Sequence, residues 1–247
     1  MKSLPLFPSL RSRSHLPELM DMADSDPLLL ERTLSQFAFI NCFLTRSRHL
    51  LRTCFMKRML QEPAREYHML DLGAGACETA VWFLDHCRRR GLRLRITACD
   101  HDPRVVEYAR SRYAEVEGLR ICERGIYDLH DLAPFDFVFS NHLLHHLSDE
   151  QIVELISHLA EFPQAEVVMN DLHRSRLAYS AYRIISPLLL RRSFARYDGL
   201  LSIMKGFRKE ELRKLAEQAA SPSAADCRVF YMPPARTVLY RPLQRAL

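Results

Sequence analysis

The segment HMLDLGAGACETA, His68 to Ala80, decides the fold of this chain. Apolar residues run into a carboxylate at Asp71, two glycines follow two positions apart, and helix-forming residues come next. Gly73 and Gly75 can adopt backbone conformations closed to other residues, so a ligand can lie directly against the main chain. The segment therefore predicts a strand, a tight turn, and a helix whose N-terminus cradles a nucleotide-type ligand.

A second carboxylate supports the same interpretation. Asp100 ends the next apolar run, LRLRITACD, and a carboxylate at this place can accept both hydroxyls of an adenosine ribose. The fingerprint of nicotinamide-binding enzymes is GxGxxG, whereas the sequence from Gly73 reads GAGACE and puts Glu78 where a small residue is needed. The residues thus favour an adenosine-type ligand and disfavour a dehydrogenase.

Composition fits one globular α/β domain with additions. The chain has 247 residues, of which 48% are hydrophobic and 26% charged. The net charge of +5 comes mostly from arginine, in blocks at 88–95 and 174–214. We interpret these blocks as solvated faces; the alternative is attraction to an acidic substrate, a carrier protein or a membrane surface.

Cysteine usage and hydropathy bear on location. The seven cysteines are scattered without a CxxC pair, which is typical of reduced core residues. No apolar run has the length of a signal peptide core or of a spanning helix. We therefore expect a cytoplasmic protein with no membrane span, for which peripheral membrane contact remains open.

Three parts follow one another along the chain. Residues 1–25 are predicted to be a loose tail or a surface strap in which nothing catalytic is expected. Residues 26–65 read as a helical cap, with Asp26 and Pro27 at its start. Residues 66–247 form the ligand-binding domain, with a helical lid inserted at about 172–206. The predicted strands lie at 67–71, 94–99, 119–122, 135–140 and 165–169, and the helices between them at 77–90, 103–116 and 149–161.

Alternating strands and helices imply a parallel sheet covered on both faces. The closing runs CRVFYM and RTVLYR add a strand pair, one member of which is expected to be antiparallel to the sheet. These features resemble the class I, Rossmann-like S-adenosylmethionine-dependent methyltransferases, through DLGAG, ACDHD, FDFVFSNHLLHHL and the closing pair. The resemblance covers about residues 66–245. It implies a doubly wound, mostly parallel seven-stranded sheet with an antiparallel last strand, S-adenosylmethionine as methyl donor and S-adenosylhomocysteine as product.

The run FDFVFSNHLLHHL, together with NDLHR and YDGLLSIMKGFRKEEL, also resembles the small-molecule branch of these enzymes. That branch includes ubiquinone and menaquinone biosynthesis enzymes and polyketide-tailoring enzymes. The resemblance implies transfer of a methyl group to an oxygen, or alternatively to a carbon, of an apolar aromatic, quinone-like or polyketide-like molecule. It implies no nucleic-acid partner, and the oligomeric state is expected to be monomer or homodimer.

The resemblance also assigns the donor site. Gly73, Ala74 and Gly75 would form the turn, and Asp71 would lie beneath the amino-acid part of the donor. Asp100 would hold the ribose, and Asn141 would face the methionine part. The candidates for the adenine wall are His101, Gly125, Ile126 and Tyr127.

Two residues depart from the family pattern. Cys77 stands where the third glycine falls, which suggests that this position packs helix against strand. Ile126 stands where many relatives carry an acidic residue. Asp128 is either displaced from that role or serves it from a shifted loop.

Three histidines are candidate catalytic bases: His145, His146 and His173. An imidazole has the intrinsic pKa to take a proton from a phenol or enol. The alternative for His145 and His146 is a packing or capping role, because Ser148 directly follows as a plausible helix cap.

A metal site is not predicted. The spacing of His142 with His145 or His146 suits zinc, but no third ligand is evident. Asn170 and Asp171 resemble part of the magnesium site of catechol-type methyltransferases, yet Asn141 replaces the carboxylate needed there.

The two additions carry an apolar and aromatic stripe. Its members are Phe37, Ile40, Phe43, Tyr179, Tyr182, Ile184 and Ile185. Core packing is one interpretation, and a lid over an acceptor pocket is the other. Other functions stay open: a non-catalytic S-adenosylmethionine-binding partner of another enzyme, or an RNA methyltransferase. The RNA hypothesis lacks support, since no RNA-binding pattern is visible and SNHL replaces the NPPY-like loop of amino-group methylators.

Overall fold

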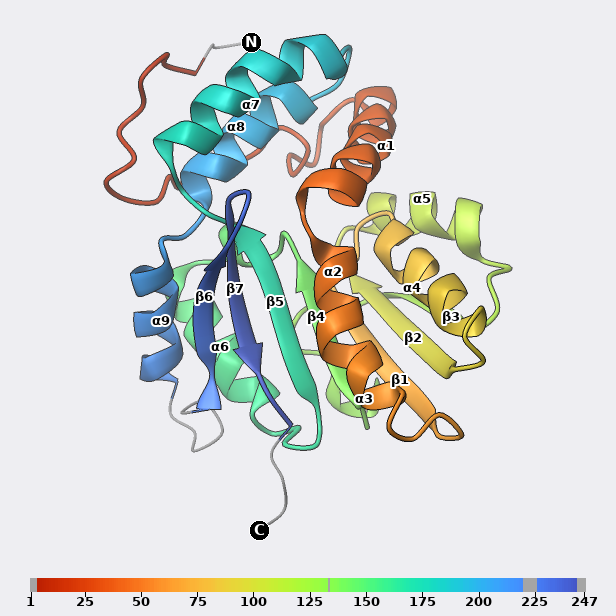
Figure 1. The fold of residues 1–247 in the computed structure, drawn as a ribbon. Helices are drawn as coiled ribbons and strands as arrows, with labels where there is room; N and C mark the ends of the chain where they lie inside the picture. Colours follow the sequence, from red (N-terminus) through yellow and green to blue (C-terminus); the bar gives the residue numbers. More distant parts are fainter. Residues whose placement is uncertain (1–3, 133, 220–225, 244–247) are drawn as a thin grey trace.

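The computed structural model describes residues 4–132, 134–219 and 226–243, without the side chains of 41–43 and 130. A single seven-stranded sheet forms the centre, and helices cover both of its faces (Figure 1). Phe43, one member of the predicted stripe, therefore lies outside the described side chains. The six cysteines with described side chains are all free thiols, as expected of reduced core residues.

The strand order is β3-β2-β1-β4-β5-β7-β6. The first five strands are parallel, and β7 runs antiparallel between β5 and β6, which confirms the predicted fold class. The order reverses between β1 and β4, so a crevice opens above their carboxyl ends. The strands are β1 Glu66–Leu72, β2 Arg93–Asp100, β3 Leu119–Glu123, β4 Phe137–Asn141, β5 Glu166–Leu172, β6 Arg228–Met232 and β7 Arg236–Arg241.

Alternate residues of β1 fill two separate cores. Leu70 and Leu72 point to one face, where they pack with residues of α6 and α9. Tyr67 and Met69 point to the other face, toward α2, α3 and α4. This burial on both faces explains the nearly continuous apolar runs of the parallel strands. Four helices that come after the glycine turn in the chain cover the two faces of the sheet. They are α4 Glu78–Arg88, α5 Pro103–Tyr113, α6 Asp149–Leu159 and α9 Lys209–Gln218.

The residues before β1 form α1 Pro27–Leu44, α2 Ser47–Leu51, a π-helical turn Arg52–Met56, and α3 Lys57–Met59. Asp26 caps α1, since its carboxylate accepts hydrogen bonds from the main-chain N–H groups of Leu28 and Leu29. The helices break at Arg46, whose φ of 59° is left-handed. In Figure 1, α2 and α3 cross one face of the sheet, while α1 lies beyond its upper edge.

The segment predicted as a lid, and called the lid below, forms α7 Arg176–Leu189 and α8 Ala195–Lys205, which lie side by side above the carboxyl ends of the strands (Figure 1). Tyr182 joins them, because its hydroxyl donates to the carbonyl of Ala195 over 2.8 Å. Gly199 permits this packing: a Cβ there would come within 2.1 Å of the Tyr182 hydroxyl. The lid and α1 together form a roof over the crevice.

Residues 4–25, called the strap below, contain neither helix nor strand and run along the lid. Leu4 and Leu10 are buried against Tyr179, whose hydroxyl donates to the carbonyl of Pro5. Further along, the N–H of Ser14 donates to the carbonyl of Met204 over 3.0 Å. The segment is therefore held against the fold by apolar burial and by hydrogen bonds.

Candidate active site

A cavity of about 790 Å³ lies between the carboxyl ends of the strands and the roof. Its volume is within the range of sites that enclose a drug-sized ligand. Every residue predicted to bind the donor lines it. These residues are Asp71, Gly73, Ala74, Gly75, Asp100, His101, Gly125, Ile126, Tyr127 and Asn141.

The glycine turn has the predicted backbone. Gly73 and Gly75 have φ of +63° and +55°, and an added Cβ at Gly75 would meet no atom within 4 Å. The N–H of Gly75 donates to Asp100 Oδ2 over 2.9 Å, so the turn is tied to the second carboxylate. Cys77 keeps a left-handed φ of 64° where the family pattern has glycine, and its side chain is buried. The turn thus keeps its shape and leaves open space above Gly75.

Two carboxyl groups lie beside this turn. Burial raises the pKa of Asp71 to about 8, and the negative charge of Asp100 adds to the rise. Burial also raises the pKa of Asp100, against the stabilising hydrogen bonds from Asp102 and Gly75. A positively charged ligand would favour the ionised form of both. The turn end of the cavity therefore suits a cation with hydroxyl groups.

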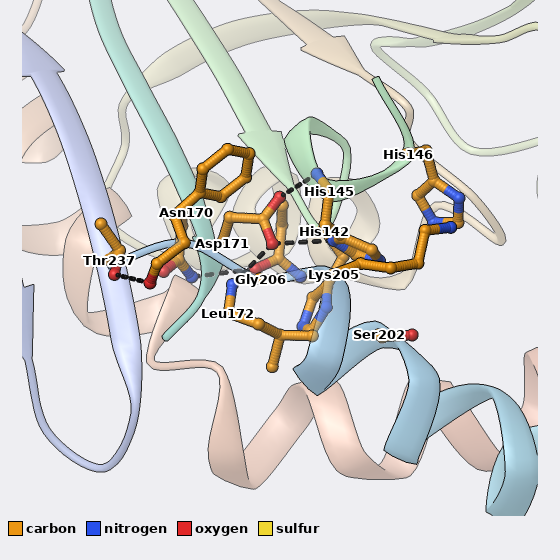
Figure 2. A network of polar contacts seen from close by, with 12 residues as sticks. His142, His145, His146, Asn170, Asp171, Leu172, Ser202, Lys205, Gly206 and Thr237 are labelled. Carbon is orange, nitrogen blue, oxygen red and sulfur yellow. Dashed lines mark hydrogen bonds and ion pairs between the residues drawn. The ribbon is translucent and has the colours of Figure 1, made fainter. Parts of the chain in front are cut away.

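The segment His142–Leu147, called the histidine loop below, follows β4. Its residue His145 is 2% exposed and lines the cavity. Asp171 at the end of β5 accepts two hydrogen bonds from it, from Nδ1 over 2.7 Å and from the main-chain N–H over 3.1 Å (Figure 2). The fully buried Asp171 thus fixes both the position and the ring orientation of His145.

The charges of this pair follow from their surroundings. Burial lowers the pKa of His145 below its ordinary value. Burial opposes ionisation of Asp171, but the hydrogen bond from His145 and the positive charge of Arg236 outweigh it and hold the pKa of Asp171 well below its usual range. We infer an ionised Asp171 and a neutral His145 that carries its proton on Nδ1 and a lone pair on Nε2.

The strap brings two carboxylates to the histidines. Glu18 Oε1 lies 3.7 Å from His145 Nε2 and accepts hydrogen bonds from Lys205 Nζ and Ser202 Oγ. Asp21 Oδ2 lies 3.0 Å from His146 Nδ1. Glu18 and Asp21 also line the cavity, so residues 1–25, in which nothing catalytic is expected, contribute two carboxylates to the candidate site. No apolar period or motif marks them, because irregular chain placed by tertiary contacts leaves no local pattern.

His146 differs electrically from His145. Its side chain is 29% exposed and lines the cavity. Desolvation would lower its pKa, but the hydrogen bond that His146 donates to Asp21 and the charges of Glu18 and Asp21 outweigh this and raise it. His146 is therefore the more readily protonated of the two neighbours.

His173, the third candidate base, is not among the residues that line the cavity. Its Nδ1 lies 3.0 Å from the hydroxyl of Thr237 on β7, and its ring meets Tyr231 edge-on. The reason is the end of β5: Asp171 faces the histidine loop, whereas His173 pairs with the closing strands. The structure brings His145 and His146 together and leaves His173 apart.

The fold brings together a set of candidate metal ligands that differs from the set considered in the sequence. Glu18, His145 and His146 each offer one ligand atom, all within 4.8 Å of one another, so Glu18 is a candidate third ligand that the sequence does not reveal. The ammonium of Lys205, however, already bonds to Glu18 over 3.1 Å. His142 does not join the cluster, because its Nε2 lies 3.0 Å from Arg236 Nη1. The zinc pairing through His142 is therefore not formed.

Comparison with known proteins agrees with this geometry. The sequence model of the methyltransferase domain family matches residues 69–165, from β1 to the start of β5. A comparison with curated proteins finds no match. Residues 69–165 therefore match a methyltransferase domain, and this agrees with the predicted resemblance to class I, Rossmann-like methyltransferases. Within the described residues, no helix is both long and apolar enough to cross a membrane.

Solved structures share the fold at low identity. The plantazolicin methyltransferase BpumL in complex with S-adenosylhomocysteine has a TM-score of 0.57 at 14% identity, over 87% of this chain and 96% of its own. The citrinin polyketide synthase CMeT domain has a TM-score of 0.54 at 13% identity, over 78% and 51%. LepI in complex with S-adenosylmethionine has a TM-score of 0.52 at 14% identity, over 75% and 45%. The match thus spans about half of the last two chains.

Proposed function

We propose that this protein transfers the methyl group of S-adenosylmethionine to an oxygen atom of an apolar small molecule. The observation that carries the proposal is a single cavity that joins the glycine turn to the His145–Asp171 pair. The matched methyltransferase domain supports the reaction class. The solved structures of similar fold that hold S-adenosylmethionine or S-adenosylhomocysteine support the donor.

The residues of the turn fit this donor. The open space above Gly75 admits a ligand against the main chain, and Asp100 can accept the ribose hydroxyls. Asp71 is a buried carboxyl group beside the carboxyl group of Asp100, and the described structure places no cation between the two. When bound, the donor supplies an activated methyl group on a positively charged sulfur. Its positive charge would stabilise the ionised forms of Asp71 and Asp100.

The rest of the cavity supplies apolar contact area for an acceptor. Side chains of α1 and of the lid line it, including Phe37, Ile40, Tyr182, Ile185 and Leu189. Such a surface excludes water and orients an acceptor, and orientation provides much of the rate of a transfer between two bound groups. The predicted stripe therefore supports a pocket wall in addition to core packing.

His145 is the base that the geometry favours. Its neutral imidazole presents Nε2 as proton acceptor, while Asp171 holds the other nitrogen. His145 Nε2 would take the proton of the acceptor hydroxyl, whose oxygen would bond to the methyl carbon as the bond from that carbon to the donor sulfur breaks and S-adenosylhomocysteine leaves. Asp171 stabilises the imidazolium that results. The charge of the ion pair thus appears only along the reaction.

Two measurements test the proposal. Calorimetric titration with S-adenosylhomocysteine should show binding to the wild type and a loss of about tenfold or more in Asp100→Ala. Incubation with methyl-labelled S-adenosylmethionine and a panel of alkylphenols should give methyl ethers, identified by mass and by loss of the phenolic proton. Absence of binding would refute the donor. Tight binding without turnover on any acceptor would favour the non-catalytic partner, and labelled carbon–carbon products would refute the oxygen acceptor.

A further inference from the structure

Arg236, the first residue of β7, is a buried cation in the wall of the cavity. Its side chain is 3% exposed, and the residue lines the cavity together with Pro234 and Ala235. Burial lowers its pKa to about 10, and the negative charge of Asp171 opposes that change. The guanidinium is therefore still protonated at neutral pH.

The partners of this guanidinium are neutral. Nε donates to Asn170 Oδ1 over 3.0 Å, and Nη2 donates to Asn141 Oδ1 and to the carbonyl of Asn170. Nη1 lies 3.0 Å from His142 Nε2. Burial and the nearby guanidinium lower the pKa of His142 well below its ordinary value, so this imidazole is neutral and accepts the hydrogen bond.

Neither the charge nor the donor set of Arg236 is fully used. Among the described residues no carboxylate forms an ion pair with it, and Asp171 instead accepts hydrogen bonds from His145 and Leu172. An arginine side chain has five N–H groups. The four hydrogen bonds above leave one N–H of Nη1 without an acceptor in the described part of the chain. The ionised Asp171 attracts the guanidinium without bonding to it, so a place for a directly bonded anion remains.

The position of Arg236 in the sheet separates it from the glycine turn. Arg236 pairs with Leu172 on β5, and β4 lies between β5 and β1. Neighbouring strands are about 4.8 Å apart, so β7 lies roughly 14 Å from β1, on the side away from Asp100. The guanidinium reaches from β7 to the end of β4, where it donates to Asn141 Oδ1, so it lies between the expected methionine part of the donor and the rest of the cavity.

We propose that Arg236 binds a carboxylate of the acceptor, in the wall of the cavity beside the ends of β4 and β5. This inference rests on the proposed function and narrows its substrate class to apolar molecules that carry a carboxylate in addition to the hydroxyl group that is methylated. The carboxylate accepts the unused N–H of Nη1 and provides a negative charge bonded directly to the guanidinium. The same contact orients the acceptor relative to His145.

The test compares two probes of equal shape, 4-hexylbenzoate and 4-hexylbenzamide, on protein saturated with S-adenosylhomocysteine. Calorimetry should show that the wild type binds the carboxylate at least tenfold more tightly than the amide. Arg236→Met and Arg236→Gln should reduce this preference to within about twofold, whereas Arg236→Lys should keep part of it. The two uncharged variants differ in polarity, so one remains informative if the other does not fold.

Arg241→Met is the matched control. Arg241 is also buried on β7, but it donates to the carbonyls of Leu159, Phe162 and Ala165 and is not among the residues that line the cavity. It should keep the carboxylate preference even if its stability falls. Equal affinity of the wild type for both probes would refute the inference, as would a preference that survives in the folded Arg236 variants.

The donor carboxylate is the other anion that Arg236 could meet. If the Arg236 variants lose affinity for S-adenosylhomocysteine but not for 5′-methylthioadenosine, which lacks that carboxylate, the inference is overturned in favour of the donor. Failure of the wild type to bind S-adenosylhomocysteine at all would instead refute the proposed function. This titration is therefore carried out before either probe is added.

Discussion

Asp171 accepts hydrogen bonds from both the ring and the main chain of His145, so one buried carboxylate at the end of β5 holds the loop that follows β4. The arrangement joins two strands that neighbour each other in the sheet but are separated by α6 in sequence. It also leaves Nε2 of the imidazole without a hydrogen bond in the described part of the chain, at 3.7 Å from Glu18 Oε1. A substitution at either residue therefore separates a catalytic role from a structural one.

We predict that Asp171→Asn and His145→Gln lower kcat by about 10²- to 10⁴-fold, the usual range for loss of an oriented base. Affinity for S-adenosylhomocysteine should change little, because neither residue lies at the glycine turn. His15→Ala is the control, since His15 is exposed on the strap and does not line the cavity. Steady-state kinetics and calorimetry measure both quantities. An unchanged kcat in folded His145→Gln would remove this histidine from the reaction.

The pH profile gives a second view of the same pair. Burial lowers the pKa of His145, so the acidic limb of kcat/KM should lie below pH 6.5, the ordinary value for histidine. Asp171→Asn removes a negative charge that favours the imidazolium. Its limb should therefore move to still lower pH while the plateau falls. A limb at or above pH 6.5 in the wild type would contradict a buried neutral base.

Asp71 predicts a pH dependence of donor binding. Its pKa of about 8 in the free protein means that the carboxyl is protonated at pH 7, whereas a cationic donor favours the carboxylate. Affinity for S-adenosylmethionine should then rise from pH 6 to 8, by at most about tenfold per pH unit, and level off above. Asp71→Asn should bind weakly with no such rise. A flat wild-type curve measured by calorimetry would show that Asp71 does not titrate on binding.

Asp71 should also make the stability of the ligand-free protein depend on pH, but in the direction opposite to donor affinity. Because the folded pKa lies above the ordinary 3.8, the ligand-free folded protein holds an extra proton between about pH 4 and 8. Its free energy of unfolding should fall as pH rises through that window, and Asp71→Asn should lose this component. Chemical denaturation of both proteins at pH 6 and pH 8.5 measures the difference. If the free energy of unfolding changes equally between the two pH values in the wild type and in Asp71→Asn, Asp71 does not have a raised pKa.

The parts of the site that the sequence predicts are local. Gly73, Gly75 and Asp100 are found at strand ends with a fixed spacing, and the strand-helix alternation determines where those ends meet. Asp26 and Ser148 are likewise correct as helix caps, because a cap acts within four residues. Short-range rules of this kind need no knowledge of the tertiary structure.

The parts that the sequence does not predict depend on distant contacts. Glu18 reaches His145 through the strap, 127 positions away, and no period in residues 4–25 marks it. His173 and His145 have the same intrinsic chemistry, and only the pairing of β5 with β7 separates them. The sequence predicts the strand of Arg236 only as part of a closing pair. The burial of Arg236 beside Asn141 and Asn170 follows from the position of that strand next to β5, which the sequence does not give.

The contact between Gly199 and Tyr182 predicts how the lid serves the acceptor. A methyl group at Gly199 would overlap the Tyr182 ring, with the nearest atoms at 2.1 and 2.3 Å. Gly199→Ala should cost about 1–3 kcal/mol of stability and raise the KM for the acceptor more than that for the donor. Tyr182→Ala should also harm acceptor use more than donor binding.

A double variant tests whether these two effects share one cause. Gly199→Ala combined with Tyr182→Leu should be more stable than the sum of the single effects predicts, because the smaller side chain relieves the overlap. Thermal denaturation of the four proteins gives the coupling. Additive effects, or equal loss of donor and acceptor binding, would indicate that α7 and α8 merely pack and do not form an acceptor wall.

Arg13 fastens the strap to the site. Its guanidinium donates to the carbonyls of Lys205 on α8 and Leu147 in the histidine loop, over 3.0 and 2.8 Å, and lies 4.1 Å from the centre of the Phe207 ring. Glu18 and Asp21 come five and eight residues later, so their placement beside the histidines depends on this anchor. Arg13→Ala leaves two carbonyls without their donor and should cost about 1–3 kcal/mol.

The expected consequence is a strap that opens before the fold does. In Arg13→Ala, limited proteolysis should cut within residues 4–25 faster than in the wild type, while affinity for S-adenosylhomocysteine stays within about threefold. The value of kcat should fall, because Glu18 and Asp21 lose their positions near His145 and His146. Arg11→Ala is the control, since Arg11 is exposed two residues away. Unchanged cleavage together with unchanged kcat would mean that the burial of Leu4 and Leu10 and the other hydrogen bonds of the strap hold it without Arg13.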